Sequence, residues 1–218
     1  EKMFDRIGVD IRRQSMARWI IKTAERLSPL MKVMDGKIIA GLSVQMDESR
    51  LQVYNEPGKD DSSQSWMWVA RGGPPQMPIT RYMYHQSREG EVAETYLDGF
   101  KGYLQSDAYG PYNKIGEWEG VVHVGCLAHV RRKFDEADKA AAKGSAASQQ
   151  ILSIIRKIYR EEKNLRGEVN LSEQEFLRRR RENVEPLFDT LGKKLEKKSD
   201  QVPPSTALGR AVGYALEV

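Results

Sequence analysis

The spacing of apolar and polar residues changes twice along the chain. From Met3 to about Met34 the apolar residues recur near helical spacing, with an interruption at Gly8-Val9-Asp10. Short apolar runs separated by turn residues then predict strands, and helical spacing returns from residue 126 to the C-terminus. This order of elements predicts an α+β or mixed α/β sheet with helices packed on it.

The middle of the chain predicts a mixed sheet of about five strands and one helix. Residues 37–57 predict two strands joined near Glu48-Ser49-Arg50 and stopped by Pro57-Gly58. Between later strands, Ser87 is expected to cap a helix that has Glu89 and Glu91 in its first turn. The remaining apolar runs predict strands at 66–70, 79–85, 103–106 and 121–124.

The C-terminal part predicts a helical region. Its helices are expected at about 126–143, 148–165, 172–197 and 204–217, separated by linkers rich in Gly, Ser, Asn or Pro.

Two alternatives remain open for the N-terminus. A short helix, a turn containing Gly8 and a second helix with polar Arg12, Arg13 and Arg18 are typical of the end of a helix-turn-helix, in which the arginines would contact DNA. The alternative is an amphipathic helical hairpin packed on the domain, and the residues alone favour it.

Composition narrows the class of protein. Of 218 residues, 30% are charged, and no apolar run approaches the roughly 18 to 20 residues of a membrane span. The single cysteine, Cys126, excludes an internal disulfide and suits a reducing cytoplasm. The net charge of +4 comes from residues 126–218, with 19 basic against 14 acidic side chains, which only weakly supports a polyanionic partner.

Two aspartates, sixty positions apart, are the main candidates for chemistry. Asp47 and Asp107 each lie at the edge of an apolar, β-prone run. Carboxylates at the ends of neighbouring strands can hold Mg²⁺ or Mn²⁺, and two such ions can drive displacement at a phosphodiester. The alternatives are a turn-forming acid for Asp47 and a helix or turn cap before Tyr109-Gly110-Pro111 for Asp107.

Five sequence blocks, in order, resemble the transposases of the insertion sequence 66 family, a bacterial group of the DDE type. The blocks span nearly the whole chain and lie at residues 10–19, 47–53, 68–75, 99–107 and 125–134. The resemblance implies a ribonuclease H-like core at 37–143, preceded by the end of a helix-turn-helix and a connecting helix at 1–36 and followed by a helical insertion at 144–218.

The resemblance also implies residue roles. Asp47 and Asp107 match the first two catalytic acids and would be the Mg²⁺ or Mn²⁺ ligands. The third, a glutamate in an asparagine-rich block, has no counterpart, and neither Glu48 nor Glu217 is expected to replace it. The chain is therefore expected to be C-terminally truncated and inactive alone.

The residues around Cys126 give further candidates. His123, Cys126 and His129 have a spacing that could suggest zinc, but a fourth ligand is missing and a zinc site is not expected. By the family resemblance, His129 would lie near the scissile phosphate, whereas both Cys126 and His129 could equally pack at a strand-to-helix junction. Arg131, Arg132 and Lys133 could grip a DNA backbone, or form a solvated helix face.

The sequence thus predicts part of a DNA transposase that cleaves transposon ends and transfers the 3′-hydroxyl into target DNA. Expected partners are transposon-end and target DNA, further copies of the complete protein and other proteins of the same element, in the bacterial cytoplasm at the nucleoid, with no membrane. Two alternatives are a related metal-dependent nuclease without strand transfer and a non-catalytic DNA-binding remnant of a disrupted element.

Overall fold

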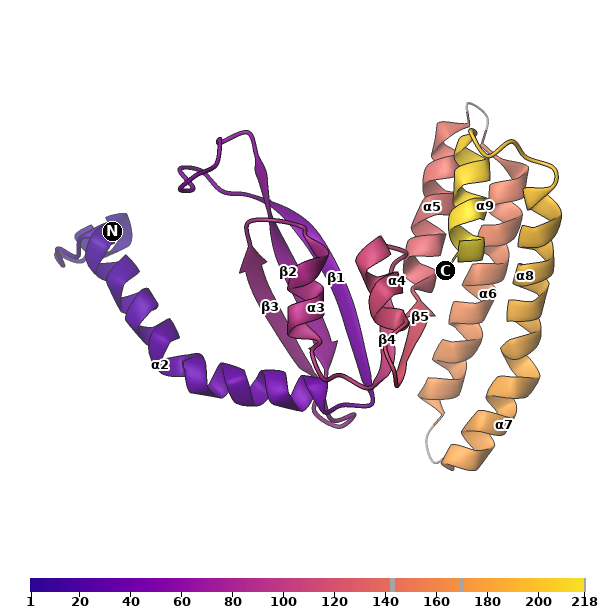
Figure 1. Cartoon of the computed structure of the whole chain (residues 1–218), viewed down its shortest axis with the longest axis horizontal. Helices are drawn as coiled ribbons and strands as arrows, with labels where there is room; N and C mark the ends of the chain where they lie inside the picture. Colours follow the sequence, from indigo (N-terminus) through magenta and orange to yellow (C-terminus); the bar gives the residue numbers. More distant parts are fainter. Residues whose placement is uncertain (142–143, 169–170, 218) are drawn as a thin grey trace. The chain divides into compact units, whose positions relative to one another are not determined.

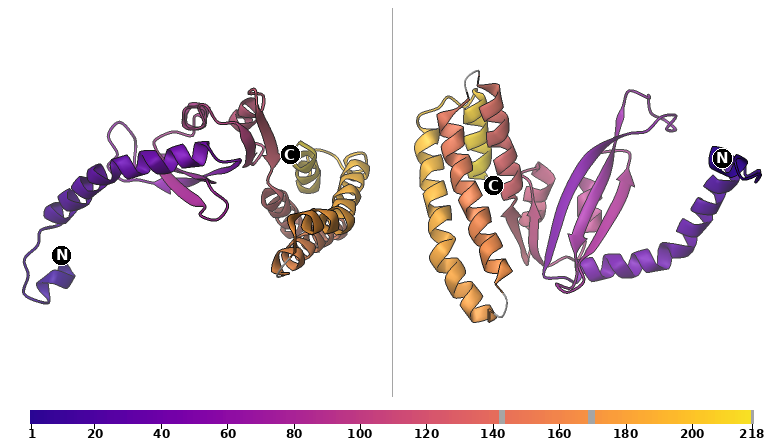
Figure 2. Two further views of the ribbon diagram at one scale, coloured as in Figure 1. Left: turned by 90° about the horizontal axis from the view of Figure 1, so that it is seen from below. Right: turned by 180° about the vertical axis from the view of Figure 1, so that it is seen from behind.

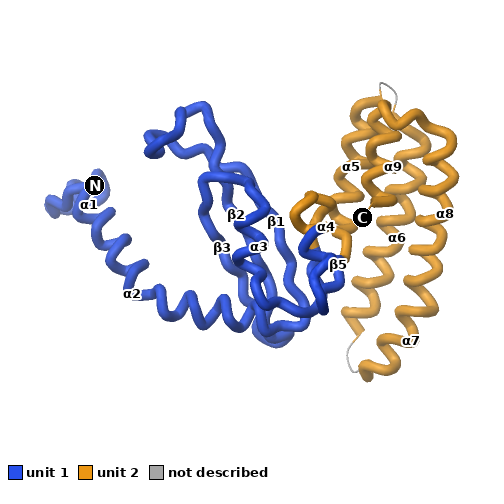
Figure 3. The backbone as a smooth tube through the Cα atoms, viewed as in Figure 1, with its two compact units in different colours: residues 1–105, 114–123 blue, residues 106–113, 124–218 orange. Residues whose placement is uncertain are grey.

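The computed structural model describes residues 1–141, 144–168 and 171–217 (Figure 1). The predicted helix end and core boundary at residue 143, and the last residue of the predicted insertion, 218, lie outside the described residues. The chain divides into two compact units, shown in Figure 3. Unit 1 comprises residues 1–105 and 114–123, and unit 2 comprises 106–113 and 124–218.

The sheet has five strands in the order β3-β2-β1-β4-β5. β1 pairs antiparallel with β2, β2 antiparallel with β3, and β1 parallel with β4. The parallel pair needs a crossover connection, and helix α3 (Gly90–Tyr96) lies within it. The predicted mixed α/β fold class is confirmed. The strands are β1 (Ser43–Gln52), β2 (Gln64–Gly72), β3 (Ile79–His85), β4 (Gly102–Ser106) and β5 (Val121–Gly125).

Alternation along β1 separates a buried face from an exposed one. Val44 and Met46 are buried, whereas Gln45 and Asp47, one position out of phase, are exposed. The buried apolar side chains of unit 1 include Ile38, Val44, Met46, Trp68, Ala70, Ala93, Leu97, Phe100, Leu104, Ile115 and Val121. The opposite face of β1 is therefore available for polar chemistry.

Two predictions for this region were wrong, and one helix was missed. Instead of two strands, residues 37–57 contain the end of α2 and one strand, β1 (Ser43–Gln52). The strand continues through its charged middle because Glu48 finds a partner elsewhere in the unit. Ser87 is not a helix cap: α3 has Glu89 as its N-cap. The segment Gly110–Gly116, for which the sequence predicted no element, forms helix α4.

Two helices precede the sheet, α1 (Lys2–Asp5) and the 27-residue α2 (Arg13–Ile39). Between them Gly8 has φ +74°, a left-handed conformation that glycine adopts without strain. Figure 1 shows α2 bent near its middle, and Pro29, which cannot donate the helical hydrogen bond, lies inside the helix. Among the α2 residues only Ile38 is buried.

Unit 2 is mainly helical. The pairs α5–α6, α6–α8, α8–α9 and α5–α9 pack together, so these four helices form a bundle (Figure 2, right). One long helix predicted at 172–197 was wrong: it is interrupted at Val184, because Pro186 is accommodated only in the first turn of a new helix. The helices are α5 (Leu127–Ala140), α6 (Ala146–Gly167), α7 (Glu173–Asn183), α8 (Glu185–Ser199) and α9 (Ala207–Glu217).

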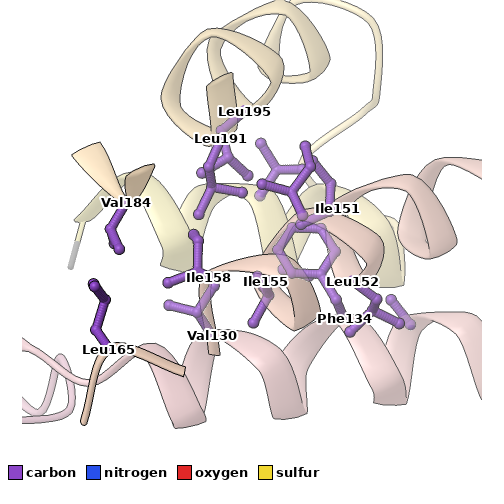
Figure 4. Close-up of a cluster of buried hydrophobic side chains, with 14 residues drawn as sticks. Val130, Phe134, Ile151, Leu152, Ile155, Ile158, Leu165, Val184, Leu191 and Leu195 are labelled. Atoms are coloured by element: carbon purple, nitrogen blue, oxygen red, sulfur yellow. The ribbon is translucent and has the colours of Figure 1, made fainter. Parts of the chain in front are cut away.

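The bundle has a contiguous apolar core (Figure 4). Phe134 of α5 is fully buried, and Ile155 of α6 and Leu191 of α8 belong to the same cluster. Burial of such side chains stabilises a bundle mainly by removing apolar area from water, about 25 cal/mol per Å². None of the described helices has the length and apolar character to cross a membrane.

Candidate functional site

Asp47 lies inside β1, on its exposed face, rather than at a strand end. Its Oδ1 accepts a hydrogen bond of 2.9 Å from the backbone N–H of Glu48. Two residues earlier on the same face, Gln45 Nε2 donates to Gln105 Oε1 of β4 at 2.5 Å. The exposed face of unit 1 therefore presents a polar row that runs across β1 and β4.

The register of β1 and β4 relates the two candidate aspartates. The parallel ladder joins Ser43 to Tyr103, Val44 to Leu104 and Gln45 to Gln105. Asp47 and Asp107 follow the last of these pairs by two residues each. Strand β4 ends at Ser106, so Asp107 is the first residue beyond it and already belongs to unit 2.

Asp107 also caps the turn that follows it. The backbone N–H of Tyr109 donates to Asp107 Oδ1 at 3.1 Å, just before helix α4. The capping role that the sequence offered for this aspartate is thus present in the structure. A carboxylate has two acceptor oxygens, so one hydrogen bond at Oδ1 is compatible with a further role.

Within unit 2, Tyr214 lies near Asp107 and near two basic residues of α5. Burial raises the pKa of Tyr214, on α9, and the negative charge of Asp107 raises it further. The backbone amide of Ala108 and the positive charge of Arg132 lower it. Lys133 Nζ lies 5.6 Å from the centre of the Tyr214 ring. Residues predicted as metal ligand and as DNA contacts therefore share one neighbourhood.

Cys126 and His129 lie at the start of α5. Cys126 is a free, partly buried thiol and the N-cap of the helix, and His129 is partly buried in its first turn. Burial raises the pKa of Tyr159, with a further contribution from Cys126. His123 is on β5 and belongs to unit 1. Over the described ranges, no group of three or more His, Cys, Asp or Glu side chains could hold a metal ion.

The predicted DNA-contacting residues fall into two sets. Arg12, Arg13 and Arg18 of unit 1 are exposed, and Arg13 pairs weakly with Glu1 at 3.5 Å. In unit 2, Arg131, Arg132 and Lys133 are exposed consecutive residues of α5, with Arg131 3.8 Å from Asp135. Exposed pairs at such distances contribute little to stability, so these cations remain available to an anionic ligand.

The sequence missed an ion pair beside Asp47. Glu48, whose side chain is 2% exposed, accepts a 2.8 Å hydrogen bond from Nε of Arg88. The guanidinium of Arg88 lies 5.0 Å from the ring centre of Trp66, and that of Arg50 lies 5.8 Å from it. These contacts hold the charged middle of β1 in a regular strand. The sequence gives no signal for them, because Arg88 is forty positions from Glu48 and the pairing of Arg50 with Trp66 appears only in the folded sheet.

The architecture defines a class of protein before any comparison. Three antiparallel strands followed by a strand parallel to the first, with carboxylates along β1 and after β4, make a mixed α/β sheet. The sequence profile described as transposase IS66 family matches residues 1–218, the whole chain. The chain therefore belongs to the transposase IS66 family.

The curated relatives are all from Sinorhizobium fredii (strain NBRC 101917 / NGR234) and described as uncharacterized proteins. The chain is 28% identical to y4qI over 228 residues and 28% identical to y4jD over 226 residues. It is 24% identical to y4hP over 225 residues. These matches cover 99%, 99% and 96% of the chain but 41%, 43% and 40% of the relatives. The chain spans about two fifths of their length.

Among solved structures, a chain in the cryo-EM structure of the simian T-cell lymphotropic virus intasome in complex with PP2A regulatory subunit B56 gamma was matched. The match has a TM-score of 0.32 and 10% identity, and it covers 63% of this chain and 45% of that one. This likeness is too remote to support the fold or the function.

Proposed function

We propose that this chain carries part of the catalytic core of a DNA transposase that cleaves strands at transposon ends and joins the resulting 3′-hydroxyl to target DNA. Asp47 and Asp107 are the two carboxylates of its metal site. The observation that carries this proposal is the β1–β4 register, which ends two residues before both aspartates, in a chain of the transposase IS66 family.

The donor chemistry fits a hard divalent cation. Mg²⁺ in proteins is usually held by one or two carboxylates together with waters and substrate phosphate oxygens, which matches two aspartates. When bound, the metal neutralises phosphodiester charge and activates the attacking oxygen. The hydrogen bond from Tyr109 to Asp107 would restrain that carboxylate, and the Gln45–Gln105 bond would hold β1 and β4 in register beneath it.

Neighbouring residues have supporting roles in the proposal. His129 would lie close to the scissile phosphate, while Arg131, Arg132 and Lys133 bind the DNA backbone as charge-assisted donors. Arg12, Arg13 and Arg18 would contact DNA as part of a helix-turn-helix. The same proposal includes the division of the chain into residues 1–36, 37–143 and 144–218 and a bacterial cytoplasmic location. It also includes further copies of the protein as partners and a third carboxylate supplied by a longer protein.

The test is Mn²⁺-dependent cleavage of labelled transposon-end DNA by a version of the protein extended to the length of its relatives. We expect Asp47→Asn and Asp107→Asn to lower the rate at least about 100-fold, because metal stabilisation supplies several kcal/mol and about 1.4 kcal/mol is tenfold. The control, Asp98→Asn, changes an exposed aspartate of unit 1 and should cleave normally.

Three outcomes separate the alternatives. Cleavage that survives both substitutions would show that the assignment of the acids is wrong. Hydrolysis without joined products would identify a nuclease rather than a transposase. If the extended protein binds DNA but never cleaves it, the chain is a non-catalytic remnant.

A further inference from the structure

A small hollow in unit 2 is lined by three lysines. It lies between α6 and α8, has a volume of about 120 Å³, and is lined by Ala147, Gln150, Ile151, Lys194, Lys197 and Lys198. Its volume corresponds to about four water molecules at roughly 30 Å³ each. This is the size of a small polar group, not of a drug-like ligand or a base.

The lysines on α8 are spaced to face one side. Positions 194, 197 and 198 differ by three and four residues, the spacing that brings side chains together on a helix. Lys194 and Lys198 are partly buried, and Lys197 is exposed. Buried Leu191 and Leu195 on α8 and Ile151 on α6 belong to the apolar core of the bundle, so the walls of the hollow are fixed by packing.

The hydrogen-bond partners of the lysines in the hollow are uncharged. Lys194 Nζ donates to Gln150 Oε1 at 3.3 Å and Lys198 Nζ to Gln201 Oε1 at 3.0 Å, and both acceptors are neutral amides. Within residues 1–141, 144–168 and 171–217, none of the three lysines makes an ion pair.

The arginines of α7 show the opposite arrangement. Arg178 binds Glu175 at 2.8 Å and Glu182 at 2.6 Å, and Arg180 binds Glu162 at 2.6 Å. The longest run of basic residues in the sequence, Arg178–Arg181, thus largely pairs with glutamates of the same chain, whereas the lysines of the hollow do not. Like charges held close together repel one another, and an anion in the hollow would relieve that repulsion.

We propose that Lys194, Lys197 and Lys198 form a phosphate-binding hollow that holds the backbone of DNA on the helical unit, outside the metal site. The proposal rests on the proposed function for the choice of DNA as the polyanion. Ammonium groups bind phosphate as point charges and read no base, so the contact is independent of sequence. It would anchor DNA and leave the chemistry to other residues.

The experiment measures binding of this chain to a random-sequence duplex at several salt concentrations, in EDTA. The variant Lys194→Gln/Lys197→Gln/Lys198→Gln is compared with Lys139→Gln/Lys157→Gln/Lys163→Gln, which removes the same charge from exposed lysines elsewhere in unit 2. Loss of one phosphate contact should lower the slope of log K against log salt by about 1. We expect that change, and about tenfold weaker binding at low salt, only in the first variant.

Each remaining outcome overturns the proposal. Equal losses in both variants would mean that binding follows net charge, and unchanged binding in the first variant would mean that DNA does not use the hollow. Inorganic phosphate is titrated separately: binding that requires the three lysines, without any effect of them on DNA, would make the hollow a site for a small anion. Because EDTA removes metal, these results do not depend on whether Asp47 and Asp107 catalyse cleavage.

Discussion

Asp107 has two roles: it accepts a hydrogen bond from the Tyr109 N–H, and we propose that it binds the metal. Two substitutions separate these roles. Asp107→Asn keeps a carbonyl oxygen that can accept the Tyr109 N–H but removes the negative charge. Asp107→Ala removes both. Loss of a comparable capping bond costs about 0.5–2 kcal/mol, and because Asp107 is only partly buried we expect about 1 kcal/mol for alanine.

Urea unfolding and Mn²⁺ titration measure the two roles on the same proteins. With a urea dependence of about 1–3 kcal/mol per M, a loss of about 1 kcal/mol lowers the midpoint by about 0.3–1 M. We expect this for Asp107→Ala and almost no shift for Asp107→Asn. Both variants should bind Mn²⁺ more than about tenfold more weakly, since even indirect partners of a metal contribute 10–100-fold. Normal Mn²⁺ affinity in Asp107→Asn would refute the ligand assignment.

Three further predictions concern stability. Phe134→Ala should cost about 3–5 kcal/mol in urea unfolding, because Phe134 is fully buried, and Phe188→Ala, where Phe188 is 41% exposed, should cost less than half as much. Gly102→Ala should cost more than about 1 kcal/mol in the same assay, because φ is +141° and a Cβ would collide with the Leu42 carbonyl. Burial, and then the charge of Asp35, raise the pKa of Tyr96 in the folded protein. Folding stability should therefore fall as the pH rises above about 10, the pKa of tyrosine in the unfolded chain. In a series of unfolding measurements at different pH values, Tyr96→Phe should reduce that fall.

The sequence located elements whose signals are local. The strands predicted at 66–70 and 79–85 match β2 and β3, because each apolar run is bounded by residues that end a strand. Helix α6, predicted at 148–165, spans Ala146–Gly167. Its start also has a local signal, because Ser145 caps the helix by accepting a hydrogen bond from the Ser148 N–H. Local capping and periodicity are sufficient where no distant partner is needed.

Errors arose where distant partners or proline decide. Two strands joined near Glu48-Ser49-Arg50 were predicted, but β1 runs through these residues, and Arg88, forty positions away, makes Glu48 compatible with burial. No helix was predicted at Pro111, although proline favours the first turn of a helix, where α4 begins. Pro186 carried the same signal for the start of α8.

The candidate site was predicted only in part for similar reasons. Asp47 and Asp107 could be found because strand-like runs and family blocks surround them, and their assignment as ligands stays a prediction. The sequence did not indicate that Asp107 shares its surroundings with Tyr214, more than one hundred residues later, because their proximity depends on tertiary packing within unit 2. The lysine-lined hollow likewise depends on the packing of α8 against α6.

The most direct measurement is a crystal structure of the extended protein with Mn²⁺ and transposon-end DNA, with anomalous scattering used to locate the metal. We predict an anomalous peak with a carboxylate oxygen of Asp47 and one of Asp107 both within about 2.0–2.6 Å of it, the range of hard-cation coordination. A peak bound by other side chains, or carboxyl groups of Asp47 and Asp107 more than about 10 Å apart, too far to share ions 3.5–4 Å apart, would contradict the account.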